Sequence, residues 1–329
     1  MKYDVITIGG ITDDIMFYTD EMQVIKNRQR FGSQVLFAFE SGGKIVSNRE
    51  VIYTAGGGGA NSAVSFARLG LRTGILAALG DDLVSNEIIA KLKKDKVNLD
   101  RLQRIRQTRT GLSFVITGSH KNEHIIFSHR AANEKLNLNS KHFSSLKTDW
   151  FYLTSLSGPY WRKNLELIFN QASKNKIKVA WNPGGTQLKS GYKNLKKYLA
   201  LTSVLILNRE EAMELVFNSG CKVKNTKKLL QILSQIGPKV VSISDGIKGA
   251  HVYSDGRYYF RKALSVVGVN TTGAGDAFGS SLVGGLILYQ NDLKKALDLA
   301  IIRSNYVVRE IGAQEGLLTL NEVRKKFKL

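Results

Sequence analysis

The chain has 329 residues, of which 43% are hydrophobic, and this is enough to build a large core. Its single cysteine, Cys221, excludes a disulfide framework, and no apolar run approaches the roughly 18 residues of a membrane span. The net charge of +21 would attract anions, but no basic stripe is interleaved with aromatic side chains. We therefore expect a cytoplasmic protein with no membrane association and no specific nucleic-acid partner.

Apolar strands alternate with amphipathic helices along most of the chain. The helix expected over 59–70 places Ala60, Ala63 and Ala67 on one face, and Gly70 ends it. This alternation predicts an α/β fold whose mostly parallel sheet is covered by helices on both faces, and the lack of a linker predicts a single domain, 1–329. The other expected elements are strands at 3–10, 72–80, 149–156, 177–182, 203–208 and 239–244 and helices at 161–176, 209–217 and 226–237.

Two stretches, about 16–54 and about 110–130, do not follow the alternation. The first is typical of an antiparallel hairpin that turns at Gly42 and Gly43, and the second of a hairpin that turns near 119–122. Such pieces could form a lid over the carboxyl edge of the sheet, where folds of this class bind ligands. A plain extension of the sheet edge is the alternative, and composition does not separate the two.

The stretch 270–278, "NTTGAGDAF", combines bare backbone with one carboxylate. If a helix begins near Asp276, the unobstructed N–H groups of Gly273–Gly275 lie at its positive end and can bind an anion. Asp276 could then cap the helix, or it could accept a proton from a hydroxyl group during phosphoryl transfer. These residues alone leave both interpretations open.

A second glycine cluster, Gly56–Gly59, precedes Asn61 and the first predicted helix. It would allow close approach to a ligand or act as a hinge, and a flexible loop is the alternative. The chain lacks a G-x-x-x-x-G-K-[ST] loop and a G-x-G-x-x-G turn after its first strand, so neither a P-loop nor a classical dinucleotide site is indicated. No pair of cysteine and histidine residues has a spacing that predicts zinc.

The two glycine-rich segments together carry a family resemblance. "GGGGANSAVSFARLG" (56–70) and "NTTGAGDAFGSSLVGGL" (270–286) resemble the two signatures of the ribokinase-like PfkB carbohydrate kinases, in the right order and about 200 residues apart. The resemblance implies a central, mostly parallel sheet with flanking helices and a small β-rich lid. It also implies an ATP- and Mg²⁺-dependent kinase that transfers the γ-phosphoryl group to a sugar hydroxyl.

The resemblance implies a role for each matching residue. Asp276 would be the base, and the backbone of Gly273, Ala274 and Gly275 would be the anion hole. Glu211 would organise Mg²⁺ through water. The sugar would contact Asp14, Gly57, Gly58 and Asn61, and the nucleotide would contact Asn208, Glu211, Ser244, Gly246 and Asn305. Exposed lid edges would permit a homodimer.

Three departures from the family pattern bear on ligands. Asn270 stands where the family usually has the aspartate that ligates a monovalent cation, so potassium binding should be weaker. Gly58 stands where ribokinases proper tend to carry lysine, and 154–159 lacks the acidic residue of a ribose site. These changes favour another sugar. A nucleoside kinase of the same fold and a catalytically silent sugar or nucleotide sensor are the alternatives.

Overall fold

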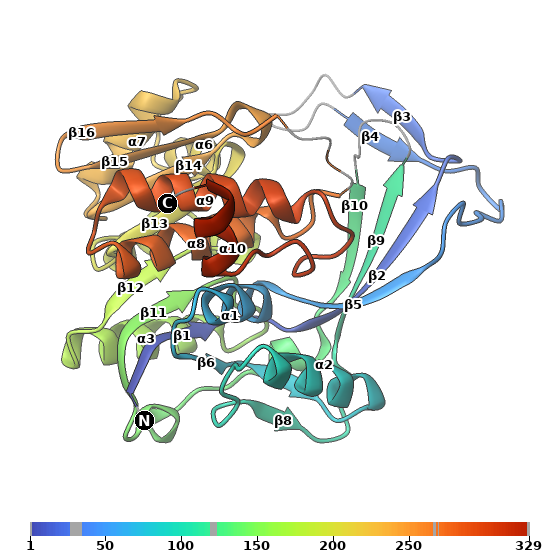
Figure 1. Cartoon of the computed structure of the whole chain (residues 1–329), viewed down its shortest axis with the longest axis horizontal. Coiled ribbons are helices and arrows are strands. Elements are labelled where there is room, and N and C mark those ends of the chain that lie inside the picture. The colour runs from blue at the N-terminus through green and yellow to red at the C-terminus, as the bar shows by residue number, and fades with distance from the viewer. Residues whose placement is uncertain (1, 27–34, 119–123, 266–267, 269, 328–329) are drawn as a thin grey trace.

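The computed structural model describes residues 2–26, 35–118, 124–265, 268 and 270–327. Within these residues the largest sheet has eight strands in the order β16-β15-β14-β13-β12-β11-β1-β6 (Figure 1). The strands from β14 to β6 are mutually parallel, and β15 and β16 extend the sheet as antiparallel strands. The bounds are β1 Lys2–Ile8, β6 Thr73–Leu76, β11 Lys147–Leu153, β12 Lys178–Trp181, β13 Val204–Asn208, β14 Val240–Ser244, β15 Ala250–Ser254 and β16 Arg257–Arg261.

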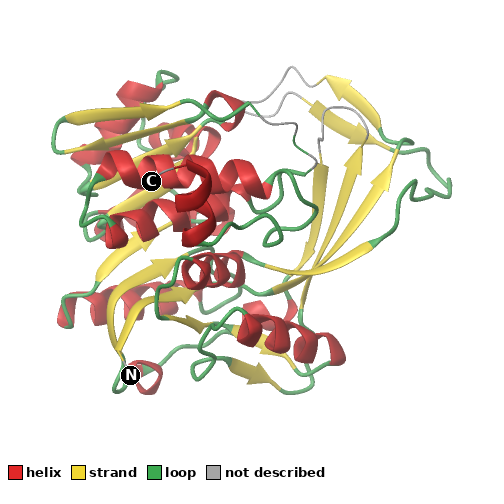
Figure 2. Cartoon of the chain, viewed as in Figure 1, coloured by secondary structure: helices red, strands yellow, loops and turns green. Residues whose placement is uncertain are grey.

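Helices cover both faces of this main sheet, as Figure 2 shows. Side chains of β1 point to both faces of the sheet: Ile6 and Ile8 pack against the helices on one face, and Val5 packs against those on the other. The predicted α/β fold with a mostly parallel sheet is therefore confirmed. The first face carries α3 Trp161–Lys174, α5 Tyr192–Leu199, α6 Arg209–Phe217 and α7 Thr226–Gln235; the second carries α8 Ala274–Leu288, α9 Leu293–Val307, α10 Leu320–Phe327 and the C-terminal part of α1 Gly58–Arg68.

A smaller sheet projects from one side of the main body (Figure 1). In the described part of the chain it has the order β10-β9-β2-β5, and β2 and β9 are parallel neighbours. A separate antiparallel pair, β3 and β4, lies beyond it. The bounds are β2 Thr12–Thr19, β3 Gln23–Lys26, β4 Val35–Ala38, β5 Ile52–Gly56, β9 Gly111–Gly118 and β10 His124–His129.

The second expected hairpin is confirmed, because β9 pairs with β10; its turn at 119–122 lies outside the described residues. The first was wrong in its pairing. The strand before Gly42 and Gly43 is β4, and it pairs with the preceding strand, β3. The strand after the two glycines, β5, pairs with β2. Residues 43–47 form no strand. Local turn residues could not reveal that β2 would supply the partner.

The strand expected over 72–80 is also divided. Residues Thr73–Leu76 form β6 in the main sheet, whereas β7 Ala78–Gly80 pairs in parallel with β8 Gln103–Ile105. All residues from 73 to 80 are buried, so their apolar pattern gave no sign of the break. The remaining α-helices in the described residues are α2 Leu83–Lys94 and α4 Gly185–Lys189, and short 3-10 helices lie at Ala131–Lys135, Ser140–Phe143 and Gly246–Lys248. Over the part of the chain that the structure describes, no helix is long and apolar enough to cross a membrane.

Candidate active site

The N-terminus of α8 is the first component of the site. Its N-cap, Gly273, has φ of 79°, and a β-carbon there would lie 2.5 Å from Ala313 Cβ, so the turn requires glycine. No described side chain caps this helix end. The N–H of Ala274 donates to the Thr271 carbonyl oxygen (3.2 Å), which leaves the next N–H groups, those of Gly275 and Asp276, for a ligand. A β-carbon on Gly275 would meet no atom within 4 Å.

Asp276 lies in the first turn of α8 and faces the glycine-rich start of α1. Asn61 Nδ2 donates a hydrogen bond to Asp276 Oδ2 at 2.8 Å. A β-carbon placed on Gly58 would come within 3.3 Å of Asp276 Oδ1, so the glycine allows the two helix starts to approach closely. Burial raises the pKa of Asp276, and the hydrogen bond from Asn61 opposes this rise. The two predicted signatures thus meet at one carboxylate.

The first turns of α8 are anchored from the interior of the protein. The Ser280 hydroxyl lies 2.5 Å from the carbonyl oxygen of Asp276 and 2.7 Å from Ser65 Oγ on α1. The buried guanidinium of Arg303 donates to Ser65 Oγ (2.7 Å), Ser281 Oγ (2.8 Å) and the Leu318 carbonyl (2.8 Å). These contacts fix α1, α8 and α9 relative to one another, so Asp276 and Asn61 sit on a rigid support.

Asp14, on β2 of the smaller sheet, supplies a second carboxylate. It is buried, and the Thr12 hydroxyl donates to its Oδ1 at 2.6 Å. A β-carbon on Gly56 would lie 1.8 Å from Asp14 Oδ2, so only glycine fits beside it. Burial raises the pKa of Asp14 to about 6, and the charges of Asp13 and Asp276 add to the rise. The smaller sheet and α8 therefore contribute carboxylates to the same region.

Asn208 and Glu211 form a capping box at the start of α6. Asn208 Oδ1 accepts from the Glu211 N–H, and Glu211 Oε2 accepts from the Asn208 N–H, both at 2.8 Å. The N-x-x-E spacing thus has a structural explanation that the sequence analysis did not consider. Burial raises the pKa of Glu211, and the charges of Glu210, Glu214 and Asp276 contribute. Among the described residues, no group of three histidine, cysteine or acidic side chains is arranged to hold a metal ion.

The other predicted nucleotide contacts lie on separate elements. Ser244 ends β14, and Gly246 follows it with φ of 51° and no atom near its missing β-carbon. Asn305, on α9, donates from Nδ2 to the Ile301 carbonyl of its own helix at 2.8 Å. No hydrogen bond between described residues joins these three to Asp276. The structure leaves their nucleotide role a prediction.

Asn270 connects the loop before α8 to the smaller sheet. Its Oδ1 accepts from the Thr272 N–H at 2.6 Å, and its Nδ2 lies 3.4 Å from Tyr18 Oη and 3.9 Å from Met16 Sδ. The side chain is buried. The oxygen expected to ligate a cation thus accepts a backbone N–H group, and weak cation binding remains a prediction.

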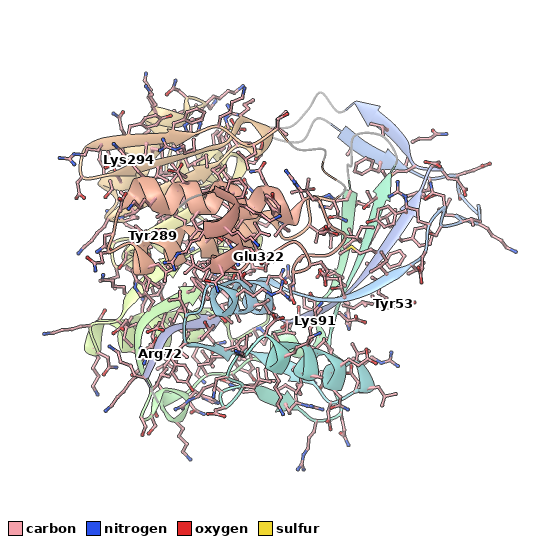
Figure 3. All side chains as sticks on the ribbon, in the orientation of Figure 1. Tyr53, Arg72, Lys91, Tyr289, Lys294 and Glu322 are labelled. Carbon is pink, nitrogen blue, oxygen red and sulfur yellow. The ribbon has the colours of Figure 1, made fainter. Side chains whose placement is uncertain are left out.

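The loop that follows α9 contacts the site, although no site residue is predicted within the loop itself. Gln314 Nε2 donates to Asn61 Oδ1 at 2.9 Å. The neighbouring Glu315 accepts from Lys91 Nζ on α2 (2.7 Å) and from the Thr54 hydroxyl on β5 (3.0 Å). Figure 3 labels Lys91 where α2 lies beside β5. "GAQEG" had no local signal, because each partner is distant in the sequence.

Comparison with known proteins gives a consistent result. Residues 27–320 match the pfkB family carbohydrate kinase. The chain is 25% identical to a ribokinase from Haemophilus influenzae over 86% of this chain and 90% of that protein. It is 25% identical to an ATP-dependent 6-phosphofructokinase from Thermoanaerobacterium thermosaccharolyticum over 100% of this chain and 95% of that protein. The structure of a Burkholderia thailandensis nucleoside kinase in complex with inosine superposes with a TM-score of 0.79 at 16% identity, covering 99% of each chain.

Proposed function

Because the chain belongs to the pfkB family of carbohydrate kinases, we propose that it transfers the γ-phosphoryl group of ATP to a sugar hydroxyl with Asp276 as the base. The observation that carries the proposal is the position of Asp276 in the first turn of a helix whose N-terminus no described side chain caps. A carboxylate beside such a helix end can take the hydroxyl proton while the N–H groups stabilise the transferred phosphoryl group.

Other residues of the chain would bind the acceptor and exclude water. Asp14 and Asn61 would orient the sugar hydroxyl, and Gly57 and Gly58 would let it approach the α1 start. The smaller sheet, which carries Asp14, would act as the lid that excludes water. Because Asp276 also contacts Asn61 directly, the acceptor hydroxyl would lie between residues that the structure already holds in place.

Glu211 would hold Mg²⁺ through water, and the ion would supply positive charge that neutralises the ATP phosphates. A single carboxylate near the phosphates suits this ion, which keeps most of its waters and takes other ligands from the nucleotide. Glu211 fits that role, since α6 follows directly on β13, which packs against α8, and the charge of Asp276 contributes to the raised pKa of Glu211. Ser244, Gly246 and Asn305 would line the nucleotide site.

Turnover against a panel of acceptors tests the proposal. Purified protein, ATP and Mg²⁺ are incubated with ribose, fructose, other hexoses, phosphosugars and nucleosides, and ADP formation is measured. We expect ADP formation that depends on a sugar. Dependence on a nucleoside alone would favour the second candidate, a nucleoside kinase, which the structural likeness to the inosine-bound enzyme supports. ATP binding without turnover on any acceptor would contradict both and favour the sensor.

Potassium is proposed to have little effect on this activity. Asn270 lacks the charge of the usual aspartate, and its oxygen accepts the Thr272 N–H. Rates measured in potassium and in a large organic cation such as tetramethylammonium should differ by less than about twofold. A large potassium stimulation would overturn this expectation.

A further inference from the structure

We propose that Gln314 is a positioning residue for phosphoryl transfer: its side-chain amide fixes the direction in which the Asn61 amide faces, so that Asn61 donates to Asp276. The inference rests on the proposed role of Asp276 as the base. Its geometry is a chain of two hydrogen bonds, from Gln314 Nε2 to Asn61 Oδ1 (2.9 Å) and from Asn61 Nδ2 to Asp276 Oδ2 (2.8 Å).

The donor and acceptor inventory makes this chain directional. An ionised carboxylate only accepts hydrogen bonds, so Asn61 must present its NH₂ group to Asp276 and its oxygen to Gln314. Gln314 must in turn present its own NH₂ group. If either amide were reversed, two oxygen atoms would face each other. The bond from Gln314 therefore stabilises the Asn61 orientation that favours the ionised, proton-accepting form of Asp276.

The packing of Gln314 is costly for stability alone. Its side chain is fully buried, and its Oε1 has no hydrogen-bond partner among the described residues. A buried oxygen without a partner destabilises the folded state, and an apolar side chain of similar shape would avoid that cost but would leave Asn61 Oδ1 without its donor. A contribution to the site explains why an amide occupies this position.

The loop that carries Gln314 is held from two sides. Arg68 Nη1 donates to the carbonyl oxygen of Gln314 at 2.6 Å. On the other side, Glu315 accepts from Lys91 and Thr54, and its Oε2 accepts the Gln314 N–H at 3.0 Å. These bonds fix the backbone of Gln314, so its side chain is held beside Asn61 before any ligand binds.

Other titratable groups face Asp276 from neighbouring elements. Asp14 on β2, Glu211 on α6 and Tyr152 on β11 each interact with its charge. Negative charge on the two carboxylates opposes the ionisation of Asp276, and among the described residues none of the three groups donates a hydrogen bond to it. The amide chain is thus the contact that favours the ionised base, and its loss should move the acid limb of the pH–rate profile upward.

The experiment compares kcat/KM from pH 5 to 9 for the full-length wild type, Gln314→Met and Gln314→Glu. Methionine keeps the length without a donor, and glutamate keeps the shape but, when ionised, attracts the Asn61 NH₂ group away from Asp276. We expect the apparent pKa of the acid limb to increase by up to about one pH unit, more for Gln314→Glu than for Gln314→Met. Activity should recover at high pH. Gln187→Met is the matched control, because this buried glutamine bonds to Leu156 and Gly184 instead.

The outcomes separate this inference from the proposed function. Wild-type protein without acceptor-dependent turnover contradicts the role of Asp276 and removes the premise. An active wild type with an inactive Asp276→Asn variant, but with superimposable acid limbs for wild type, Gln314→Met and Gln314→Glu, overturns the positioning role alone. An acid limb that Gln187→Met shifts equally would also overturn it. Thermal unfolding of each variant shows which losses come from destabilisation.

Discussion

The helices α6 and α8 begin differently. Asp276 lies in the first turn of α8, and its charge contributes to the pKa of Glu211 in the first turn of α6. At α6, Asn208 and Glu211 satisfy each other's backbone N–H groups. At α8, the N-cap is a left-handed glycine, and no described side chain replaces it. A capped helix start gains stability, whereas an uncapped one keeps donors for a ligand. The start of α6 therefore stabilises the fold, whereas the start of α8 has N–H groups that can bind a ligand.

Apart from substitution of Asp276 itself, filling the space at the α8 start should have the largest effect. Gly275→Ala adds a methyl group where no atom lies within 4 Å, so the helix tolerates it. The methyl group would occupy the space proposed for the phosphoryl group, and we expect kcat/KM to fall about 100-fold. The unfolding temperature should be unchanged or slightly higher, since alanine is a better helix former than glycine.

Gly273→Ala is the control for that variant. Its φ of 79° and its approach to Ala313 make it destabilising, so it should lower the unfolding temperature. Full activity of Gly275→Ala would contradict an anion hole at this helix end.

The next largest effect is the destabilisation of the folded state by the buried carboxylate of Asp14. Because the pKa of Asp14 is raised to about 6, the folded protein holds this proton more tightly than the unfolded chain does. Folding stability should therefore fall as pH rises from about 4 to about 6 and stay lower above that range. Asp14→Asn should raise the free energy of unfolding at pH 8 by about 2 kcal/mol and flatten this dependence, while sugar binding weakens. Denaturant unfolding at pH 5 and pH 8 measures the difference, and equal stabilities of wild type and variant at pH 8 would refute it.

The smallest effect concerns the capped helix start. Glu211→Gln keeps the capping box but removes the charge, whereas Glu211→Ala removes both. We expect only Glu211→Ala to lose stability, by about 1 kcal/mol. Both variants should need more Mg²⁺ for half-maximal activity. If Glu211→Gln needs the same Mg²⁺ concentration as the wild type for half-maximal activity, then Asn208 and Glu211 only cap the helix.

Local patterns predicted much of this molecule. The apolar face of α3 and the alternation of strands and helices were sufficient for the main sheet, because each signal lies within one element. Glycines beside Asp276 and Asn61 likewise marked two helix starts. The pairing of β2 with β9 and of β3 with β4 could not be predicted in this way, since it depends on which distant strand supplies the partner.

The same limit applies to the site. Gln314 contacts Asn61 across 253 residues, and Thr54 contacts Glu315 across 261, so no spacing rule connects them. The capping role of Asn208 and Glu211, in contrast, is visible as an Asn-x-x-Glu pattern before an apolar stretch. The structure was needed to show that this pattern satisfies its own helix end.

Acceptor-dependent ADP formation by Asp276→Asn, measured beside the wild type, tests the central claim most directly. Asparagine preserves the shape and can still accept from Asn61, but it cannot take a proton. We predict a loss of about 1,000-fold in turnover, with ATP binding and thermal unfolding close to those of the wild type. Turnover within a fewfold of the wild type would contradict the role of Asp276 as the base and leave it a structural residue of the α8 start.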